Sequence, residues 1–486
     1  MTTTLLAPPP PPPPPVAKPP APQSRLDRFF HITKRGSTTG REVRGGLTTF
    51  VAMAYIVLLN PLILAGAADV TGAKLSFVQL TTMTALSACV TTILMGVVGK
   101  APLALAAGLG VNAVVAYQIA PQVTWAQAMG LVVLEGVAIV LLAASGVREA
   151  IMNAIPMPLK HAIGVGIGMF IALIGLVDAG FVSRIPDAVG TVVPVTLGAG
   201  GHLAGWPILV FAVGVITMIA LYSRKVPGAI LISIVVATLL AMAIETIVHP
   251  KGWGLITPEL PSSPLALPDF ALFGQIDLFG AFGKIGAITL GVFLFTLVLS
   301  GFFDAMGTIL GVSNDAGLVD KNGKMPGMGR VLMVDGVGAA FGGVTSSSAN
   351  TVFVESAAGV GEGARTGLSS VVTGGMFGAL MFLAPLAAVV PQQAAAPALV
   401  LVGALMASQA RHIDWSDLEF SIPAFLTIVL MPFTYSITNG VGAGVIAFVV
   451  IKAARGKWRE PGILMWLVAL IFAGYFGING IRALVG

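Results

Sequence analysis

The sequence is a succession of apolar runs, and each run is about as long as a membrane helix. A helix that crosses a bilayer needs about 20 mostly apolar residues. By that measure, residues 45–454 contain about fourteen spans, and a further apolar stretch runs from Ile463 to Ile481. Soluble domains carry about 25% charged residues, whereas this chain carries only 10%. The pattern predicts an all-α polytopic membrane protein, with the lipid bilayer as a partner.

The basic residues, the histidines and the single cysteine argue against several other classes of protein. The net charge of +5 does not indicate nucleic-acid binding, because basic residues of membrane proteins gather in cytoplasmic loops. Cys89 lies inside an apolar run, so no disulfide framework, cysteine metal site or Cys/His catalytic pair is expected. The histidines lack the spacing of metal ligands. We therefore expect no metal, no cofactor and no enzymatic activity.

The distribution of basic residues predicts the topology. Residues 1–24 are of low complexity and contain an unbroken proline run, so we expect a disordered tail outside the fold. The basic stretch 25–44 then places the N-terminus in the cytoplasm by the positive-inside rule. Further along the chain, loops with basic residues alternate with loops that lack them, such as 120–126 and 436–439. This alternation agrees with about fourteen spans in the cell membrane.

Two of the predicted spans are unlike ordinary membrane helices. The third, 101–117, and the tenth, 341–359, are short and rich in glycine or hydroxyl residues. Backbone that is not helical is tolerated at membrane depth only when it is buried in protein or lines a cavity. The two segments are seven spans apart, an odd number, so they would enter the membrane in opposite senses, as in transporters built from inverted repeats.

This interpretation divides the chain into two repeats of seven spans with flanking pieces. The predicted parts are a tail (1–24), a first repeat (25–248), an extracytoplasmic loop (249–285), a second repeat (286–454) and a C-terminal extra hydrophobic segment (455–486).

Three carboxylates lie inside predicted spans, at Glu135, Asp304 and Glu355. An ionisable residue in a membrane segment is a candidate functional residue by default. Glu355 lies within the broken tenth span, and Asp304 shares a helix face with Thr308. A buried carboxylate without a partner would take up a proton, which can couple proton movement to substrate binding. For Glu135 we favour a structural role, because nothing around it breaks the helix.

Several motifs around these residues resemble one family of membrane proteins. They are Gly46-Leu-Thr-Thr-Phe-Val-Ala-Met-Ala-Tyr55, Gly108-Leu-Gly-Val-Asn112, Phe302-Phe-Asp-Ala-Met-Gly-Thr308, Val354-Glu-Ser-Ala-Ala-Gly-Val-Gly-Glu-Gly-Ala-Arg-Thr-Gly367 and Ile422-Pro-Ala-Phe-Leu-Thr-Ile428 with Met431-Pro-Phe-Thr-Tyr-Ser436. Together they are similar to the hypoxanthine/adenine/guanine permeases, a branch of the nucleobase–cation symporters related to uracil and xanthine permeases. The resemblance runs from about residue 27 to 455.

The resemblance implies a fold, a function and a set of site residues. The implied fold has fourteen segments in two inverted repeats of seven, with segments 3 and 10 part strand and part helix, and with a core domain and a gate domain. The implied function is proton-coupled uptake of purine nucleobases, with a proton as co-substrate and a homodimer as the assembly. The implied substrate-binding residues are Glu355, Asp304, Asn112, Thr308, Val354, Phe353 and Thr351, and proton coupling falls to Asp304 and Glu355. Asn350 and Phe353 depart from the family's usual residues before the glutamate.

Other functions fit the sequence less well. A sulfate-type anion transporter of the same architecture should have a neutral or positive pocket, whereas this chain places acids in the matching segments. An intramembrane aspartyl protease would need a Gly-x-Gly-Asp motif, and no such motif accompanies Asp304. A passive channel would not accumulate its substrate against a gradient.

Overall fold

A computed structural model describes residues 24–145, 155–184, 195–261, 263–320 and 325–485. The proline-rich tail expected at 1–24 therefore lies outside the described residues up to position 23. The burial and side-chain contacts of Asp304 and of its neighbours Phe302 and Phe303 also lie outside the described part, although their backbone forms helix.

Within the described ranges, nine helical segments are long and apolar enough to cross a membrane. They are α2 with α3 (Thr39–Met53 and Ile56–Gly66), α4 (Phe77–Leu94), α6 (Trp125–Ser145), α8 (Met157–Asp178), α9 (Trp206–Ser223), α10 (Ala229–Val248), α14 with α15 (Gly367–Leu380 and Ala384–Ala387), α16 (Gln392–Ala407) and α18 (Ile437–Ala454). Four further helices are α11 (Ala287–Asp315), α12 (Met328–Val344), α17 (Leu418–Phe433) and α19 (Gly462–Val485). The prediction of a polytopic helical membrane protein is thus confirmed.

Short elements join or extend these helices. They are α1 (Arg25–Phe30), the 3-10 turns η1 (Thr33–Arg35), η4 (Ala120–Gln122), η5 (Gly280–Gly283), η6 (Met381–Leu383) and η7 (Ser408–His412), and the π-helical turns η2 (Met95–Gly99) and η3 (Val115–Ile119). A hairpin of β2 (Val182–Arg184) and β3 (Val195–Leu197) follows α8 and was not expected from the sequence.

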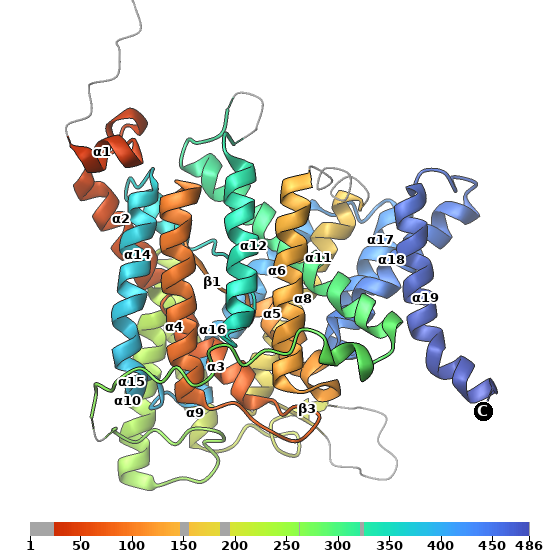
Figure 1. The fold of residues 1–486 in the computed structure, drawn as a ribbon. Helices are drawn as coiled ribbons and strands as arrows, with labels where there is room; N and C mark the ends of the chain where they lie inside the picture. The colour runs from red at the N-terminus through yellow and green to blue at the C-terminus, as the bar shows by residue number, and fades with distance from the viewer. Residues whose placement is uncertain (1–23, 146–154, 185–194, 262, 321–324, 486) are drawn as a thin grey trace, which may run out of the picture.

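The two unusual segments meet inside the helix bundle. Each begins as a strand and continues as a short helix: β1 (Leu105–Ala107) leads into α5 (Leu109–Val114), and β4 (Asn350–Val352) leads toward α13 (Ser356–Gly361). The strands are antiparallel, with Ala106 opposite Thr351, and all their residues are buried. Figure 1 places β1 near the middle of the molecule, among the long helices. The strand-then-helix form expected of both segments is therefore found.

The first long helical segment is interrupted halfway. The α-helix stops at Met53 and resumes at Ile56, and Pro61 follows inside α3. Proline has no N–H to donate, so it removes one hydrogen bond from the helix ladder. The interruption places Tyr55 at the break, where its side chain is buried in the protein.

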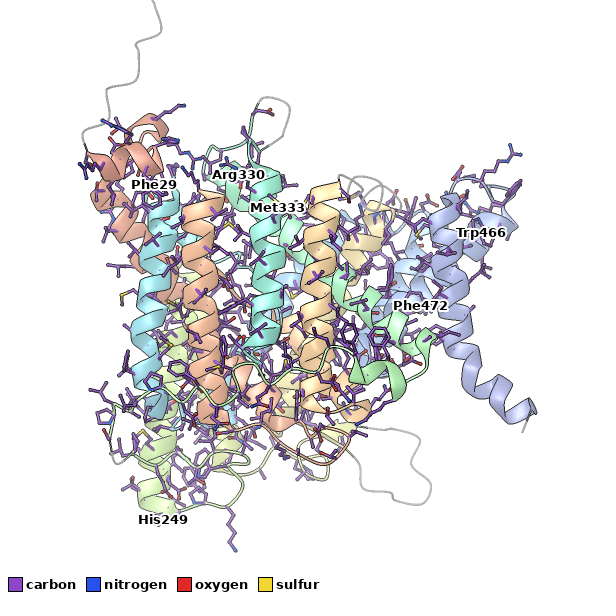
Figure 2. All side chains as sticks on the ribbon, in the orientation of Figure 1. Phe29, His249, Arg330, Met333, Trp466 and Phe472 are labelled. Atoms are coloured by element: carbon purple, nitrogen blue, oxygen red, sulfur yellow. The ribbon has the colours of Figure 1, made fainter. Side chains whose placement is uncertain are left out.

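Labelled residues mark the two ends of the helix bundle. In Figure 2, Phe29 and Arg330 lie at one end and His249 at the opposite end. The segment between α10 and α11 runs along the His249 end (Figure 1). Arg35 ties two loops together at the Arg330 end, because its Nη1 donates to the carbonyls of Lys100 at 2.6 Å and Arg365 at 3.0 Å.

Helices α6 and α12 pack with their backbones in close contact. A Cβ placed on Gly136 would lie 2.2 Å from the backbone nitrogen of Ala340 and 2.6 Å from the carbonyl oxygen of Gly336. Small residues allow this approach, which is a common source of packing energy between membrane helices. On its other side α12 contacts α4 and β4, and Figure 1 shows α4, α12 and α6 side by side.

We predict that Gly136→Ala destabilises the protein by about 1–3 kcal/mol, the usual cost of overpacking, because the backbone of α12 cannot yield as a side chain can. Gly375→Ala in α14 is the matched control, since a Cβ there has nothing within 4 Å. Thermal unfolding in detergent, followed by tryptophan fluorescence, measures both variants. Equal melting temperatures for the two would contradict the close packing.

Candidate functional site

A cavity of about 140 Å³ lies where the third and tenth segments face α8, α11 and α16. A single water needs only about 10–15 Å³ measured in the same way, so the space admits a small molecule. The wall combines the starts of α5 and α8, the end of α16 and the chain after β4. Ligand sites of broken-helix transporters lie at such places, where irregular backbone lines a cavity.

Glu355 provides a carboxylate in this wall. It sits directly before α13, and Tyr55 donates a hydrogen bond from its hydroxyl to Glu355 Oε1 at 2.5 Å. The neighbouring Ser356 hydroxyl accepts from the Ala104 backbone N–H at 3.0 Å and donates to the Phe353 carbonyl at 2.7 Å. The loop that carries Glu355 is thus fixed to both strand segments, and one carboxylate oxygen keeps free capacity to accept from a ligand.

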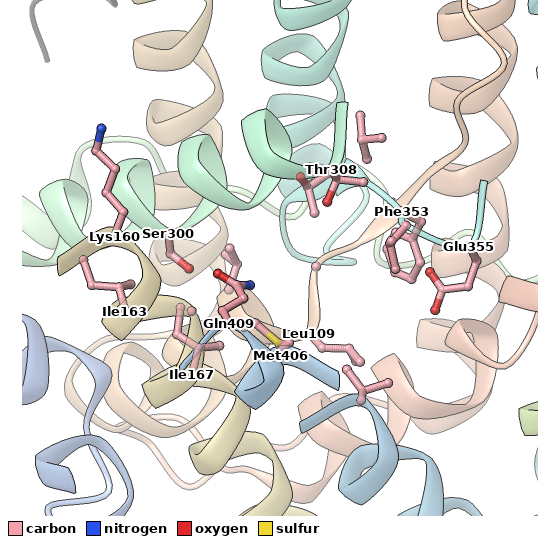
Figure 3. A pocket seen from close by; sticks show the side chains of 18 of the residues that line it. Leu109, Lys160, Ile163, Ile167, Ser300, Thr308, Phe353, Glu355, Met406 and Gln409 are labelled. Atoms are coloured by element: carbon pink, nitrogen blue, oxygen red, sulfur yellow. The ribbon is translucent and has the colours of Figure 1, made fainter. Parts of the chain in front are cut away.

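The other side chains of the cavity offer mixed chemistry. Figure 3 shows Glu355 and Phe353 on one side, Lys160 and Ser300 on the other, and Gln409 with Met406 between them. The Lys160 ammonium donates to the Met157 sulfur at 3.6 Å, and this is not its only interaction. The amide of Gln409 can donate and accept. The wall therefore combines apolar surface with a few polar groups, as is usual for small-molecule sites.

Five of the seven substrate-binding residues expected from the sequence line this cavity: Thr308, Thr351, Phe353, Val354 and Glu355. Thr351 Oγ1 is buried and has no hydrogen-bond partner among the described residues, so it is available to a ligand. Position 304 falls between Ser300 and Thr308 on the face of α11 that lines the cavity, with its side chain outside the described part.

Asn112 is placed differently. It lies on α5 with its side chain fully buried, behind the first turn of that helix, which lines the cavity. Neither atom of its amide has a hydrogen-bond partner within the described residues. Asn112 therefore adjoins the cavity wall rather than forming part of it, and its assignment to substrate binding stays a prediction.

Asn350 and the preceding serines have structural contacts. The Asn350 amide donates to Ser87 Oγ at 2.7 Å and Thr91 Oγ1 at 3.0 Å on α4. Ser346 donates to the carbonyl of Leu272 at 3.0 Å, and Ser347 is bonded to Thr345 at 2.9 Å. These polar residues hold the strand segment in place and do not line the cavity.

Four further residues line the cavity and were not predicted from the sequence: Tyr55, Ser300, Gln409 and Met406. Tyr55 ends one of the motifs that carry the family resemblance, which was the available signal. Met406 lies in the last turn of α16 and Gln409 in η7 directly after it, and only the packing of α16 and η7 against α8 brings them to the cavity.

Beyond the cavity, the space between α8, η3 and α18 is closed by rings and hydrogen bonds. Tyr435 packs against Tyr117 with ring centroids 5.4 Å apart and against Phe170 at 5.0 Å. Gln118 Oε1 accepts from Thr438 Oγ1 at 2.9 Å and Ser436 Oγ at 3.1 Å. We call Tyr117, Phe170 and Tyr435 with these Gln118 bonds the closure. It lies one or two turns past the cavity along both α5–η3 and α8.

Comparisons with known proteins agree with this architecture. The family model described as "Permease family" matches residues 40–442. The chain is 37% identical to the adenine permease AdeQ of Escherichia coli over 92% of this chain and 95% of that protein. It is 34% identical to the guanine/hypoxanthine permease PbuO of Bacillus subtilis over 91% of this chain and 98% of that protein.

Among solved structures, the chain resembles the transmembrane domain of the cyanobacterial bicarbonate transporter BicA. The TM-score is 0.61 at 16% identity, and the match covers 84% of this chain and 97% of that one. At this identity the likeness shows the fold alone, that of a helical polytopic membrane protein.

We predict that Asn350→Ala lowers the free energy of unfolding by about 1–3 kcal/mol, because it removes two buried hydrogen bonds to α4. Thr351→Val, at the next position of the same strand, removes only an unpartnered hydroxyl and should leave stability unchanged or slightly raised. Thermal unfolding of the two purified variants separates these expectations. An equal fall for both would mean that Asn350 does not anchor the strand.

Proposed function

The chain belongs to the Permease family, and on that premise we propose that it imports purine nucleobases by proton symport with alternating access. Adenine, guanine and hypoxanthine are the proposed substrates, because the relatives at 34–37% identity are named adenine and guanine/hypoxanthine permeases. The observation that carries the proposal is the Glu355 carboxylate, held by Tyr55 in the wall of the cavity.

The cavity suits a planar base with donors and acceptors along its edge. Glu355 accepts from a ring N–H or an exocyclic amino group, and Gln409 or Thr351 completes the pairing. The first turn of α5, Leu109–Val111, lines the cavity, and the first N–H groups of a helix have no partner within it. Phe353 covers a face of the ring. A site with such buried groups rejects analogues that leave them unpaired.

The proposal includes a topology. We propose fourteen segments in two inverted repeats, 25–248 and 286–454, with α19 as an additional helix and a homodimer as the assembly. The antiparallel pairing of β1 with β4, each at the start of a short helix, supports opposite orientations of the two repeats. Arg35 bonds to Lys100 and Arg365 at one end of the bundle, which supports a cytoplasmic N-terminus in the cell membrane by the positive-inside rule.

The second candidate is an anion transporter of the same fold. It is favoured by the bicarbonate transporter among the structural neighbours and by Lys160 in the cavity wall. Against it stands Glu355, whose charge disfavours an anion at the position where the third and tenth segments meet.

We predict that cells without their own nucleobase carriers accumulate labelled purine when they express this chain, and that a protonophore abolishes the accumulation. Glu355→Gln should lower uptake about tenfold or more, since a charge-assisted hydrogen bond contributes about 1.5–3 kcal/mol. Glu362→Gln is the control, because that carboxylate is paired with Arg44 at 2.7 Å and does not line the cavity.

The same assay includes uracil, sulfate and bicarbonate. Uptake of an anion without uptake of any base would replace the proposal with the second candidate. Base uptake that never exceeds the external concentration would indicate a passive channel.

Alternating access predicts that the closure opens once in every cycle. In a Cys89→Ser background, Tyr117→Cys with Tyr435→Cys places two thiols where the rings now pack. A short cleavable cross-linker should stop purine uptake, and cleavage should restore it. The single Tyr435→Cys variant controls for the reagent. Undiminished uptake by fully cross-linked protein would show that the closure does not gate transport.

A further inference from the structure

Among the described residues, Glu135 is a buried carboxyl that neither the cavity nor a described hydrogen bond explains. It lies on α6, fully shielded from solvent, and neither carboxylate oxygen has a hydrogen-bond partner among the described residues. A polar group in this position costs free energy unless it is paired or changes its protonation state. In a membrane segment such a residue is a functional candidate by default.

The chain shows how it treats carboxyls with a structural role. Glu42, equally buried, accepts from the backbone N–H groups of Arg365 at 2.8 Å and Thr366 at 3.2 Å. Glu419, also buried, is bonded by Lys452, Arg455 and Lys457. Glu135 has no such donors in the described structure. The structural role favoured from its sequence context would require donors of this kind.

The surroundings of Glu135 place it against the back of α11. A Cβ on Gly301 would lie 2.6 Å from Glu135 Oε1, so the glycine leaves room for the carboxyl. The preceding residue, Ser300, lines the cavity on another face of the same helix. The carboxyl therefore lies across one helix from the proposed substrate, within one turn of position 304.

The titratable groups around Glu135 are few. Asp335 on α12, also buried, is close enough to act on it electrostatically. On α11, Gly301 faces the carboxyl, and η5 carries no titratable side chain. From η3, Tyr117 packs against Tyr435. The charged neighbour is thus another acid, and no described cation stabilises an ionised Glu135.

We propose that Glu135 is a proton-binding site of the transport cycle, which holds a proton in the state seen here and exchanges it when α11 moves relative to α6. The inference rests on the proposed proton symport and adds a residue outside the substrate cavity. The proton binds to a carboxylate oxygen, so no other reactant is needed. Movement of α11 would change the groups that surround the carboxyl of Glu135. The free energy needed to ionise Glu135 would change with them.

The test compares Glu135→Gln with Glu42→Gln and the wild type. Glutamine imitates a permanently protonated carboxyl, so Glu135→Gln should still exchange internal for external labelled purine. It should lose at least tenfold in accumulation, and its uptake should no longer depend on external pH. Glu42→Gln is expected to keep the wild-type pH profile and accumulation per folded transporter, even if its yield falls.

Infrared spectroscopy tests the proton directly. Wild-type protein should show a protonated-carboxyl band that changes between acidic and alkaline buffer, and Glu135→Asp should shift that band. This second measurement stands if Glu135→Gln does not fold. The inference is wrong if Glu135→Gln keeps wild-type accumulation and pH dependence, or if Glu135→Asp leaves the band unchanged. Either result would leave the proposed function standing. Absence of purine uptake by the wild type would overturn the proposed function and the symport on which the inference rests.

Discussion

The antiparallel pairing of β1 with β4 allows two non-helical segments to lie inside the helix bundle. Each backbone polar group left unpaired in the hydrocarbon region costs several kcal/mol, so two non-helical segments can lie there only if their backbone groups find partners within the protein. The strands pair antiparallel, and the Gly108 N–H to Ala349 carbonyl and Phe353 N–H to Ala104 carbonyl bonds, both 2.9 Å, extend the pairing on either side. The two short helices then start from fixed points, which puts Leu109 and Glu355 into one cavity wall.

The close approach of the two segments requires small residues around them. A Cβ on Gly108 would lie 2.9 Å from Thr351 Cγ2, and one on Gly110 would lie 2.9 Å from Ile167 Cγ2. Larger residues would push α5 away from β4 and from α8 and so distort the cavity. The glycines in these spans are therefore part of the site, although they offer no side chain to a ligand.

The sequence predicted the parts of this arrangement that depend on local composition. Glycine and hydroxyl residues inside apolar runs indicated where helices would break, and Glu355 stood out as an acid beside such a break. Residues brought in by packing alone could not be predicted. Gln409 reaches the cavity because α16 packs on α8, and Asn350, next to Thr351, is drawn to α4 by Ser87 and Thr91. Neighbouring residues of a strand face opposite sides, and the sequence did not show which side would be the cavity.

Helix α11 lies between the cavity residues and Glu135. Ser300 and Thr308, eight positions apart, lie on its cavity side, whereas Gly301 turns toward α6 and Glu135. A rigid helix cannot shift one face without shifting the other, so any movement that accompanies substrate binding also changes the environment of Glu135. A buried carboxyl without a hydrogen-bond donor is costly to ionise, because water does not solvate the charge. A small change in its access to water therefore changes the free energy of ionisation strongly. In the proposed symport, substrate and proton would thus influence each other through one helix without touching.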